Sequence, residues 1–326
     1  MKYSFTTIYQ MRHLTTLFLL LLSAVTYGQQ TAEDFLNQGK AKYENRDYPG
    51  AKADLDKAIA LSAKNAEAFT IRGNVLYKLQ DSKAALEDYS RAIALDPTAA
   101  RALHNRGIIK KDMKDYDGAL KDYNKAIEAA PDSAYMYSSR ALLLMAVKRD
   151  YKAAIKDLNT IVKLTPNDAE AYNMRGIAKG RMKDAKGGID DFTKAIELTP
   201  QDAENYYYRG YLKMDLSQNK EAIPDFDKAI ELNEHHTAAF SEKGNANFLL
   251  KNYPEAIAAY TKALNLEPDG KTYYYRGVSK MKTKDENGAC QDFQEAEKQG
   301  YKIDDKTVLS FIKSCAKVNA RTYIIN

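Results

Sequence analysis

Arginine and aspartate recur together along this 326-residue chain and could form a regular series of strong polar contacts. Each arginine precedes its aspartate by sixteen or seventeen residues, which places the two on neighbouring predicted helices. A guanidinium and a carboxylate on facing antiparallel helices can form two parallel hydrogen bonds. We therefore expect structural ion pairs, with a row of cations that grips an acidic ligand as the alternative. The expected pairs are Arg72 with Asp88, Arg106 with Asp122, Arg140 with Asp157, Arg175 with Asp191, Arg209 with Asp225, and Arg276 with Asp292.

The two cysteines are the second set of reactive residues. Cys290 and Cys315 lie close together in sequence near the C-terminus. In an oxidising compartment a disulfide between them would stabilise the fold by about 3 kcal/mol through loop entropy. Two buried free thiols are the alternative.

Catalytic and cofactor motifs are missing from the sequence. G-x-S-x-G, H-E-x-x-H and C-x-x-C do not occur, and Gly270, Lys271 and Thr272 lack the upstream glycine of a phosphate-binding loop. His235 and His236 have only Glu234 beside them, whereas a zinc site needs three or four converging ligands. We expect no catalytic residue, no cofactor and no bound metal.

The charge balance argues against nucleic acid as a partner. The chain has 49 Lys and Arg against 44 Asp and Glu, for a net charge of +5, and these residues are evenly spread. Binding to nucleic acid would need a clustered basic stripe.

The first 28 residues have the features of a signal peptide. Lys2 and Arg12 precede an apolar run from Leu14 to Val25, which is too short for the roughly 20 apolar residues of a membrane span. A polar sequence follows Gly28, which suits cleavage there, with an uncleaved anchor as the alternative. We expect an exported chain, periplasmic or secreted, that meets the membrane only through this segment or through an envelope complex.

After Gln30 small residues recur with a period of 33 to 35 residues. One series is Gly39, Gly73, Gly107, Ala141, Gly176, Gly210, Gly244 and Gly277, and a second is Ala51, Ala85, Ala119, Ala154, Gly188, Ala222, Ala256 and Ala289. In the unit 66–99, apolar residues follow a helical spacing in two blocks that are separated by Gln80, Asp81 and Ser82. Each unit is therefore predicted to be a helical hairpin in which Gly73 faces Ala85 and Ala92, so that the helices can approach closely.

These residues resemble the tetratricopeptide repeat family. The family pattern is visible in Gly73, Tyr77, Ala85, Tyr89, Ala92 and Pro97 of one unit, and in Gly210, Ala222, Phe226 and Ala229 of another. The resemblance covers residues 32–300 and implies an all-α, right-handed superhelix of eight hairpins whose first helices line a concave groove for peptides or partner proteins. The expected units are 32–65, 66–99, 100–133, 134–168, 169–202, 203–236, 237–269 and 270–300. The segment 301–326 is expected to hold a capping helix, at 305–317, and a tail.

The residues that face the groove follow from helix geometry. Positions 4, 7, 8 and 11 of a first helix share its packed side, so positions 2, 5, 6, 9, 12 and 13 point toward the groove. Tyrosine and adaptable methionine are typical of binding surfaces. The expected partner-binding residues are Tyr207, Tyr208, Tyr211, Tyr274, Tyr275, Asn245 and Phe248. The alternative is that the tyrosines pack against neighbouring hairpins.

One activity of the family can be tested on the sequence. Repeats that hold chaperone C-terminal carboxylates resemble one another in a clamp of Lys and Asn over three successive units. Here Asn37, Asn74, Asn105 and Asn245 are isolated fragments of that clamp, so a chaperone-tail adaptor is not expected.

We therefore expect a non-enzymatic, exported scaffold that binds a protein or peptide segment in its groove. The alternatives are a structural part of an envelope assembly and an accessory subunit of a glycan-processing complex, in which tyrosines would stack on sugar rings.

Overall fold

The computed structural model describes residues 30–322, with side chains to residue 315. The predicted signal peptide, residues 1–28, lies outside the described residues. The described chain is helical, with no strand, which confirms the all-α fold class.

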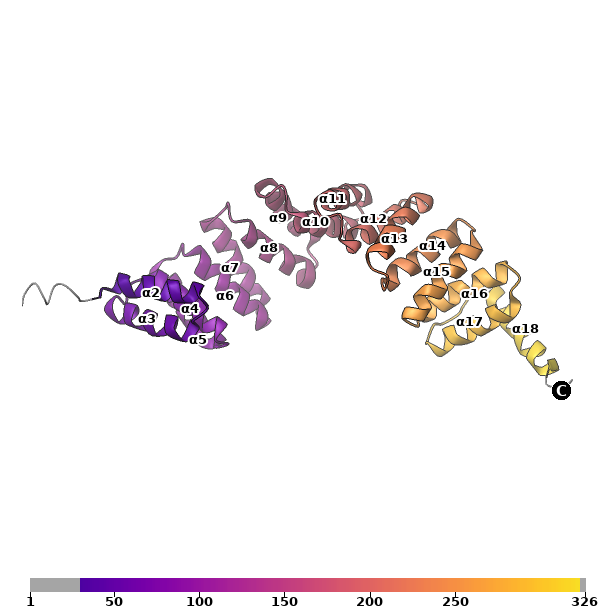
Figure 1. The fold of residues 1–326 in the computed structure, drawn as a ribbon, viewed down its shortest axis with the longest axis horizontal. Helices are drawn as coiled ribbons and strands as arrows, with labels where there is room; N and C mark the ends of the chain where they lie inside the picture. Colours follow the sequence, from indigo (N-terminus) through magenta and orange to yellow (C-terminus); the bar gives the residue numbers. More distant parts are fainter. Residues whose placement is uncertain (1–29, 323–326) are drawn as a thin grey trace, which may run out of the picture. The chain divides into compact units, whose positions relative to one another are not determined.

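The helices follow one another as a series of antiparallel pairs (Figure 1). They are α2 (Ala32–Glu44), α3 (Tyr48–Leu61), α4 (Ala66–Lys78), α5 (Ser82–Leu95), α6 (Ala100–Asp112), α7 (Tyr116–Ala129), α8 (Ala134–Leu143), the π-helix η1 (Leu144–Lys148), α9 (Tyr151–Leu164), α10 (Ala169–Arg181), α11 (Ala185–Leu198), α12 (Ala203–Asp215), α13 (Asn219–Leu232), α14 (Thr237–Leu249), α15 (Tyr253–Leu266), α16 (Gly270–Lys282), α17 (Glu286–Lys298) and α18 (Lys306–Thr322). The chain divides into two compact units, an N-terminal unit up to Met136 and a C-terminal unit from Tyr137. Each is described by itself.

The turn inside each pair has a common local cause. The residue after the C-cap of the first helix has a positive φ, as at Gln80, where φ is 66°. The equivalent φ is 60–67° in every pair except the fourth, and the next residue is the N-cap of the second helix. In the second pair, the Asp81 side chain accepts a hydrogen bond from the Ala84 N–H at 3.0 Å. A capping aspartate satisfies one of the free N–H groups at a helix N-terminus, so it ends the turn and begins the new helix.

Within a pair, a glycine of the first helix lets an aromatic ring of the second lie against the backbone. A Cβ added at Gly73 would lie 2.6 Å from a ring carbon of Tyr89, and one added at Gly210 would lie 2.9 Å from the ring of Phe226. Tyr89 and Phe226 are almost completely buried. At Gly73 the three nearest atoms all belong to Tyr89, a contact that the sequence did not predict. At Gly39 and Gly107 the carbonyl oxygens of Ala51 and Ala119, the residues equivalent to Ala85, also lie 3.3 Å from the added Cβ.

The fourth pair departs from the others in its first helix. The unit 134–168 is one residue longer than its 34-residue neighbours, and α8 continues into the π-helix η1. A π-turn takes one additional residue without ending the helix. The insertion is therefore absorbed before Arg149, which ends the turn with a φ of 52°.

The last helix covers the end of the C-terminal unit. Val308 of α18 is buried in a cluster with Phe293 and Ala289 of α17, and Phe311 meets the ring of Phe293 edge-on at 6.1 Å between centroids. A terminal repeat needs such a cover because no further hairpin packs on its apolar face. Cys290 of α17 and Cys315 of α18 are joined by a disulfide, with their Cα atoms 6.0 Å apart.

Candidate functional site

The arginine and aspartate residues form buried pairs inside the hairpins. Arg209 donates to Asp225 from Nε at 3.1 Å and from Nη2 at 2.6 Å, and Lys213, one turn further along α12, lies 2.7 Å from the same carboxylate. The Asp225 side chain is only 5% exposed. The structure places the same arginine-to-aspartate contact in all six predicted pairs: Arg72 with Asp88, Arg106 with Asp122, Arg140 with Asp157, Arg175 with Asp191, Arg209 with Asp225 and Arg276 with Asp292.

The remaining guanidinium nitrogen reaches the preceding repeat, a contact that the sequence did not predict. Arg72 donates from Nη1 to Asp56 of α3 at 2.8 Å. Arg175 donates in the same way to Asn159 of α9 at 2.9 Å, and Arg276 to Thr261 of α15 at 3.1 Å. Each of these arginines therefore joins a first helix to the second helices of two successive hairpins. Its donors are used within the fold, which leaves little for an acidic ligand.

The Asp122 carboxylate stays ionised despite its burial. Burial opposes ionisation of Asp122, but hydrogen bonds from Arg106 and Lys110 outweigh it, so the pKa of this carboxyl lies below its usual value. Lys110 lies 2.8 Å from the Asp122 carboxylate.

The first helices carry surface pockets on the side opposite the arginine–aspartate pairs. Two lie in the N-terminal unit, with volumes of about 230 and 260 Å³, and two lie in the C-terminal unit, with volumes of about 320 and 570 Å³. All four are lined by first helices of successive repeats, together with the loops or second helices beside them. The groove side of the first helices is thus hollowed repeatedly in both units.

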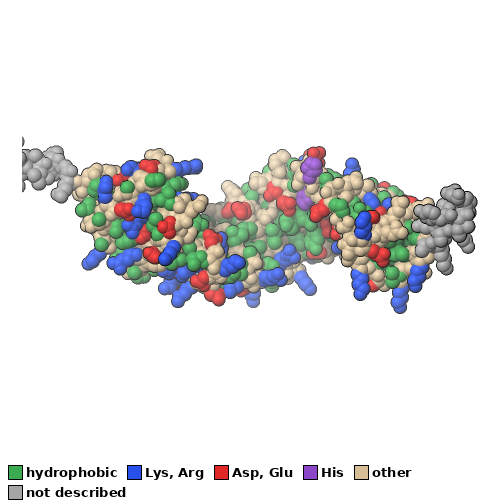
Figure 2. All heavy atoms as spheres, turned by 90° about the horizontal axis from the view of Figure 1, so that it is seen from below, with side chains coloured by type: hydrophobic (Ala, Val, Ile, Leu, Met, Phe, Trp, Pro, Cys, Tyr) green, Lys and Arg blue, Asp and Glu red, His purple; other side chains and the backbone are tan. Residues whose placement is uncertain are grey.

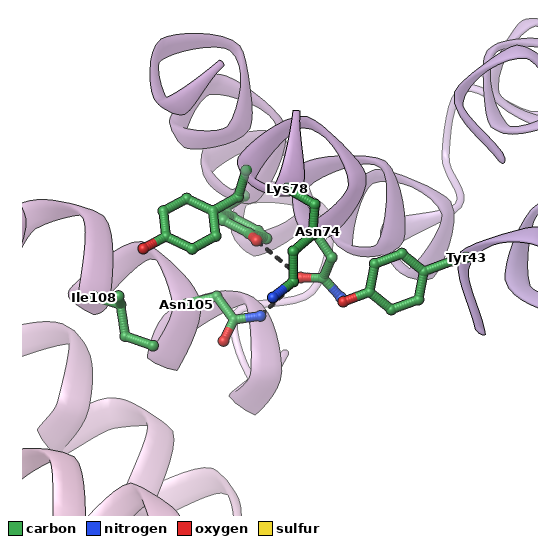
Figure 3. A pocket seen from close by; sticks show the side chains of 7 residues that line it. Tyr43, Asn74, Lys78, Asn105 and Ile108 are labelled. Atoms are coloured by element: carbon green, nitrogen blue, oxygen red, sulfur yellow. Dashed lines mark hydrogen bonds between the residues drawn. The ribbon is translucent and has the colours of Figure 1, made fainter. Parts of the chain in front are cut away.

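The 230 Å³ pocket of the N-terminal unit is polar at its base and aromatic at its sides (Figure 3). Asn74 Oδ1 accepts hydrogen bonds from the Tyr89 hydroxyl at 2.8 Å and from Asn105 Nδ2 at 2.7 Å. Tyr43 and Lys78 stand beside them. The packing of α4 beside α6 thus brings Asn74 and Asn105 into direct contact, which the sequence did not predict.

The predicted tyrosines of α12 differ in their surroundings. The Tyr208 ring stacks on Phe192 at 5.6 Å between centroids, and the Tyr207 ring lies 6.3 Å from that of Phe226. Both side chains are half-buried. Tyr211 is 42% exposed and is the most accessible of the three.

The predicted residues of α14 and α16 form a connected group. The Tyr275 ring meets Phe248 at 5.5 Å and Tyr274 at 5.2 Å between centroids. Tyr274 also faces Tyr301 at 5.0 Å, so it helps to hold the segment that leads to α18. Asn245 accepts a hydrogen bond from the buried Tyr260 hydroxyl at 2.8 Å. Asn245 and Tyr275 line the 320 Å³ pocket.

Other kinds of site find little support in the described residues. No group of three or more His, Cys, Asp or Glu in residues 30–322 could hold a metal ion, and no helix among them is long and apolar enough to cross a membrane. Basic and acidic side chains are intermixed over the face shown in Figure 2.

Stacked helical hairpins with a small residue facing an aromatic ring and a hollowed first-helix side define a helical-repeat scaffold for protein interaction. The chain belongs to the tetratricopeptide repeat family. Models described as TPR or tetratricopeptide repeats match residues 73–114, 100–133, 169–202 and 207–271.

Solved structures show the same fold. The chain is similar to YrrB, described as a TPR protein with an unusual peptide-binding site, with 24% identity over 58% of this chain and 97% of that one and a TM-score of 0.55. It is also similar to the C-terminal part of a TPR repeat-containing protein from Cytophaga hutchinsonii, with 20% identity, coverage of 72% and 95%, and a TM-score of 0.58. A tetratricopeptide repeat protein from Parabacteroides merdae matches with 20% identity, coverage of 76% and 97%, and a TM-score of 0.54. A search of curated sequences finds no match.

Proposed function

We propose that this chain is an exported, non-enzymatic scaffold that binds an extended segment of a partner protein along the groove side of its first helices. The observation that carries this proposal is the set of four pockets between successive first helices, two in each unit. An extended segment presents side chains at regular intervals, so a row of pockets suits it better than one deep cavity does. The peptide-binding site named for YrrB, a protein of the same fold, agrees with this use.

The sharpest probe of the groove is Tyr211. Tyr207 and Tyr274 contact core rings, so their removal would disturb packing as well as binding. Tyr211 is exposed and meets one other ring, that of Tyr207 at 6.4 Å, among the ring contacts of the described residues. A Tyr211→Ala variant therefore tests the surface with little effect on the fold.

The experiment is a selection of peptides from a random display library on the immobilised mature chain. We expect enriched peptides whose binding is weakened about tenfold by Tyr211→Ala, and unchanged by Tyr151→Ala at the start of a second helix. Circular dichroism checks that all variants stay equally helical. No enrichment, or equal binding by every variant, would overturn the groove proposal.

Export rests on the sequence of residues 1–28 and agrees with the disulfide, since such bonds persist in oxidising compartments. The measurement is the intact mass of the chain isolated from its native cells. Removal of residues 1–28 supports export, and a full-length mass in the cytosolic fraction contradicts it.

A further inference from the structure

The two pockets of the C-terminal unit differ in charge from those of the N-terminal unit. Six acidic side chains and one basic side chain line them: Glu170, Asp202, Glu204, Glu242, Glu267, Asp269 and, as the single cation, Lys271. The two N-terminal pockets are lined by two acidic and two basic side chains, Glu67, Asp96, Lys78 and Arg101. The groove of the C-terminal unit is therefore electronegative, and that of the N-terminal unit is balanced.

Two of these six carboxylates cap helices, and the four glutamates do not. Asp202 accepts from the Glu204 N–H at 3.0 Å, and Asp269 accepts from the Thr272 N–H at 2.7 Å, so both cap helices. Glu170 and Glu204 stand on the rim of the 570 Å³ pocket, and Glu242 and Glu267 stand on the rim of the 320 Å³ pocket. One carboxylate oxygen of Glu242 also accepts a hydrogen bond from Asn245 Nδ2 at 3.0 Å. Because none of the four glutamates caps a helix, their carboxylates are the ones offered to a ligand.

A buried histidine stands behind Glu204. His236 Nδ1 accepts from the Ala239 N–H at 3.3 Å, so in the neutral ring the proton is on Nε2. This Nε2 is buried, has no hydrogen-bond partner among the described residues, and lies 3.4 Å from Glu204 Oε1. One carboxylate oxygen of Glu204 thus lies beside the ring edge without a hydrogen bond to it, and the buried Nε2 is left without an acceptor.

Each pocket also presents a tyrosine ring beside its glutamates. Tyr208 lines the first pocket, and its ring stacks on Phe192 on one side. Tyr275 lines the second, and the Nζ of Lys271 lies 6.0 Å from its ring centroid. A cation is attracted to the face of an aromatic ring, and more strongly when carboxylates stand near it. The chain's own ammonium already occupies this position in the second pocket.

We propose that the C-terminal groove selects a partner segment that carries Lys or Arg side chains, each received by a pair of glutamates and a tyrosine ring. Glu170, Glu204 and Tyr208 would receive one cation, and Glu242, Glu267 and Tyr275 another. At the second position the ammonium group of Lys271 would compete with the cation of the partner. This inference rests on the proposed function and names the chemistry of the partner at the same surface.

The test uses peptides selected from the random library on the mature chain. We expect the selected pool to contain an excess of Lys and Arg over the starting library. We expect its best member, followed by fluorescence anisotropy, to bind at least about tenfold more weakly to the variant in which Glu170, Glu204, Glu242 and Glu267 are all changed to Gln. Lys271→Ala should strengthen binding severalfold, and added salt should weaken it.

A matched control separates local from overall charge. Glu197, Glu221, Glu231 and Glu255 are exposed on second helices, so changing them to Gln removes the same charge away from the groove. This control should leave binding within about twofold of the parent chain. A pool without excess Lys and Arg, or equal loss in both four-residue variants, would overturn the cation proposal. If peptides of such a pool still lose binding in the Tyr211→Ala variant, the groove proposal holds and only the cation proposal fails. If no peptide is enriched, both proposals fail.

Discussion

At the scale of single residues, the arginine that six of the hairpins carry joins their two helices. Arg72 bonds Asp88 of its own hairpin through Nε and Nη2, and Asp56 of the preceding hairpin through Nη1. The Phe69 ring lies 5.5 Å from the centre of its guanidinium. Lysine has no fork of donors that could make these contacts together. In the seventh repeat the equivalent residues are Lys243 and Ala259. Lys243 forms an ion pair with Asp227 of the preceding hairpin at 2.5 Å.

That natural replacement predicts the outcome of a paired substitution. Asp88→Ala should lower the free energy of unfolding by about 1–3 kcal/mol, because two guanidinium donors lose their partner in a partly buried place. Adding Arg72→Lys should restore about 1 kcal/mol, because the ammonium can pair with Asp56 alone. Urea unfolding gives both values, with Glu197→Ala on the surface as a control that should change stability by less than about 0.5 kcal/mol. A double variant less stable than Asp88→Ala would contradict the explanation.

The same ladder predicts a pH dependence. The pKa of Asp122 is lowered in the folded chain, so its contribution to stability is present above its unfolded-state pKa of about 3.9 and is lost as the pH falls through the lower folded value. Asp122→Asn should therefore be less stable than the parent chain at neutral pH, and the difference should shrink below about pH 4. Urea unfolding at pH 7, 4 and 3 measures it. A difference that stays constant down to pH 3 would show that this carboxylate does not act through its charge.

At the scale of helices, the hairpin depends on matching a small residue with a ring or a leucine. Gly210 faces Phe226, whereas Gly39 of the first hairpin faces Leu55. The fourth repeat has Ala141 and Leu158 at the equivalent positions, both completely buried. A methyl group on the first helix therefore goes with a smaller side chain on the second.

This matching predicts coupling between two substitutions. Gly210→Ala should cost about 1–3 kcal/mol, because its Cβ would lie 2.9 Å from the Phe226 ring in a packed core. The double variant with Phe226→Leu should cost less than the sum of the two single variants, because the leucine leaves room for the methyl group. Thermal or urea unfolding of all four chains tests the coupling. Strict additivity would mean that the ring is not what requires the glycine.

At the scale of the whole molecule, each hairpin contacts mainly its neighbours, so each repeat is stabilised chiefly by the interfaces with the repeats beside it. The last hairpin of the described residues is that of α16 and α17. There α18 covers the apolar face of α17, and the disulfide between Cys290 and Cys315 ties the two helices together.

Reduction of this disulfide should loosen the array from that end. The loss of loop constraint is worth about 3 kcal/mol, and we expect faster amide exchange first in α18 and α17 and then in α16, with the N-terminal unit unchanged. Hydrogen exchange followed by mass spectrometry, with and without reductant, measures the order. A uniform change over the chain, or none in α17 and α18, would contradict the role of the disulfide as an end tie.

The all-helical fold and the pairing of arginine with aspartate follow from the amino-acid sequence alone. Both are local: the helical period and the 34-residue repeat bring each pair together inside one hairpin, whatever the hairpin packs against. The tertiary structure decided what depends on how successive hairpins stack. This includes the bond from Arg72 to Asp56, the contact of Asn74 with Asn105, and the difference between exposed Tyr211 and half-buried Tyr207. Helix position alone placed both tyrosines on the groove side, because it contains no information about the neighbouring ring that covers one of them. The same holds for the glutamates of the C-terminal pockets, since Glu170 and Glu204 stand at groove-facing positions but line one pocket only because α10 packs beside α12.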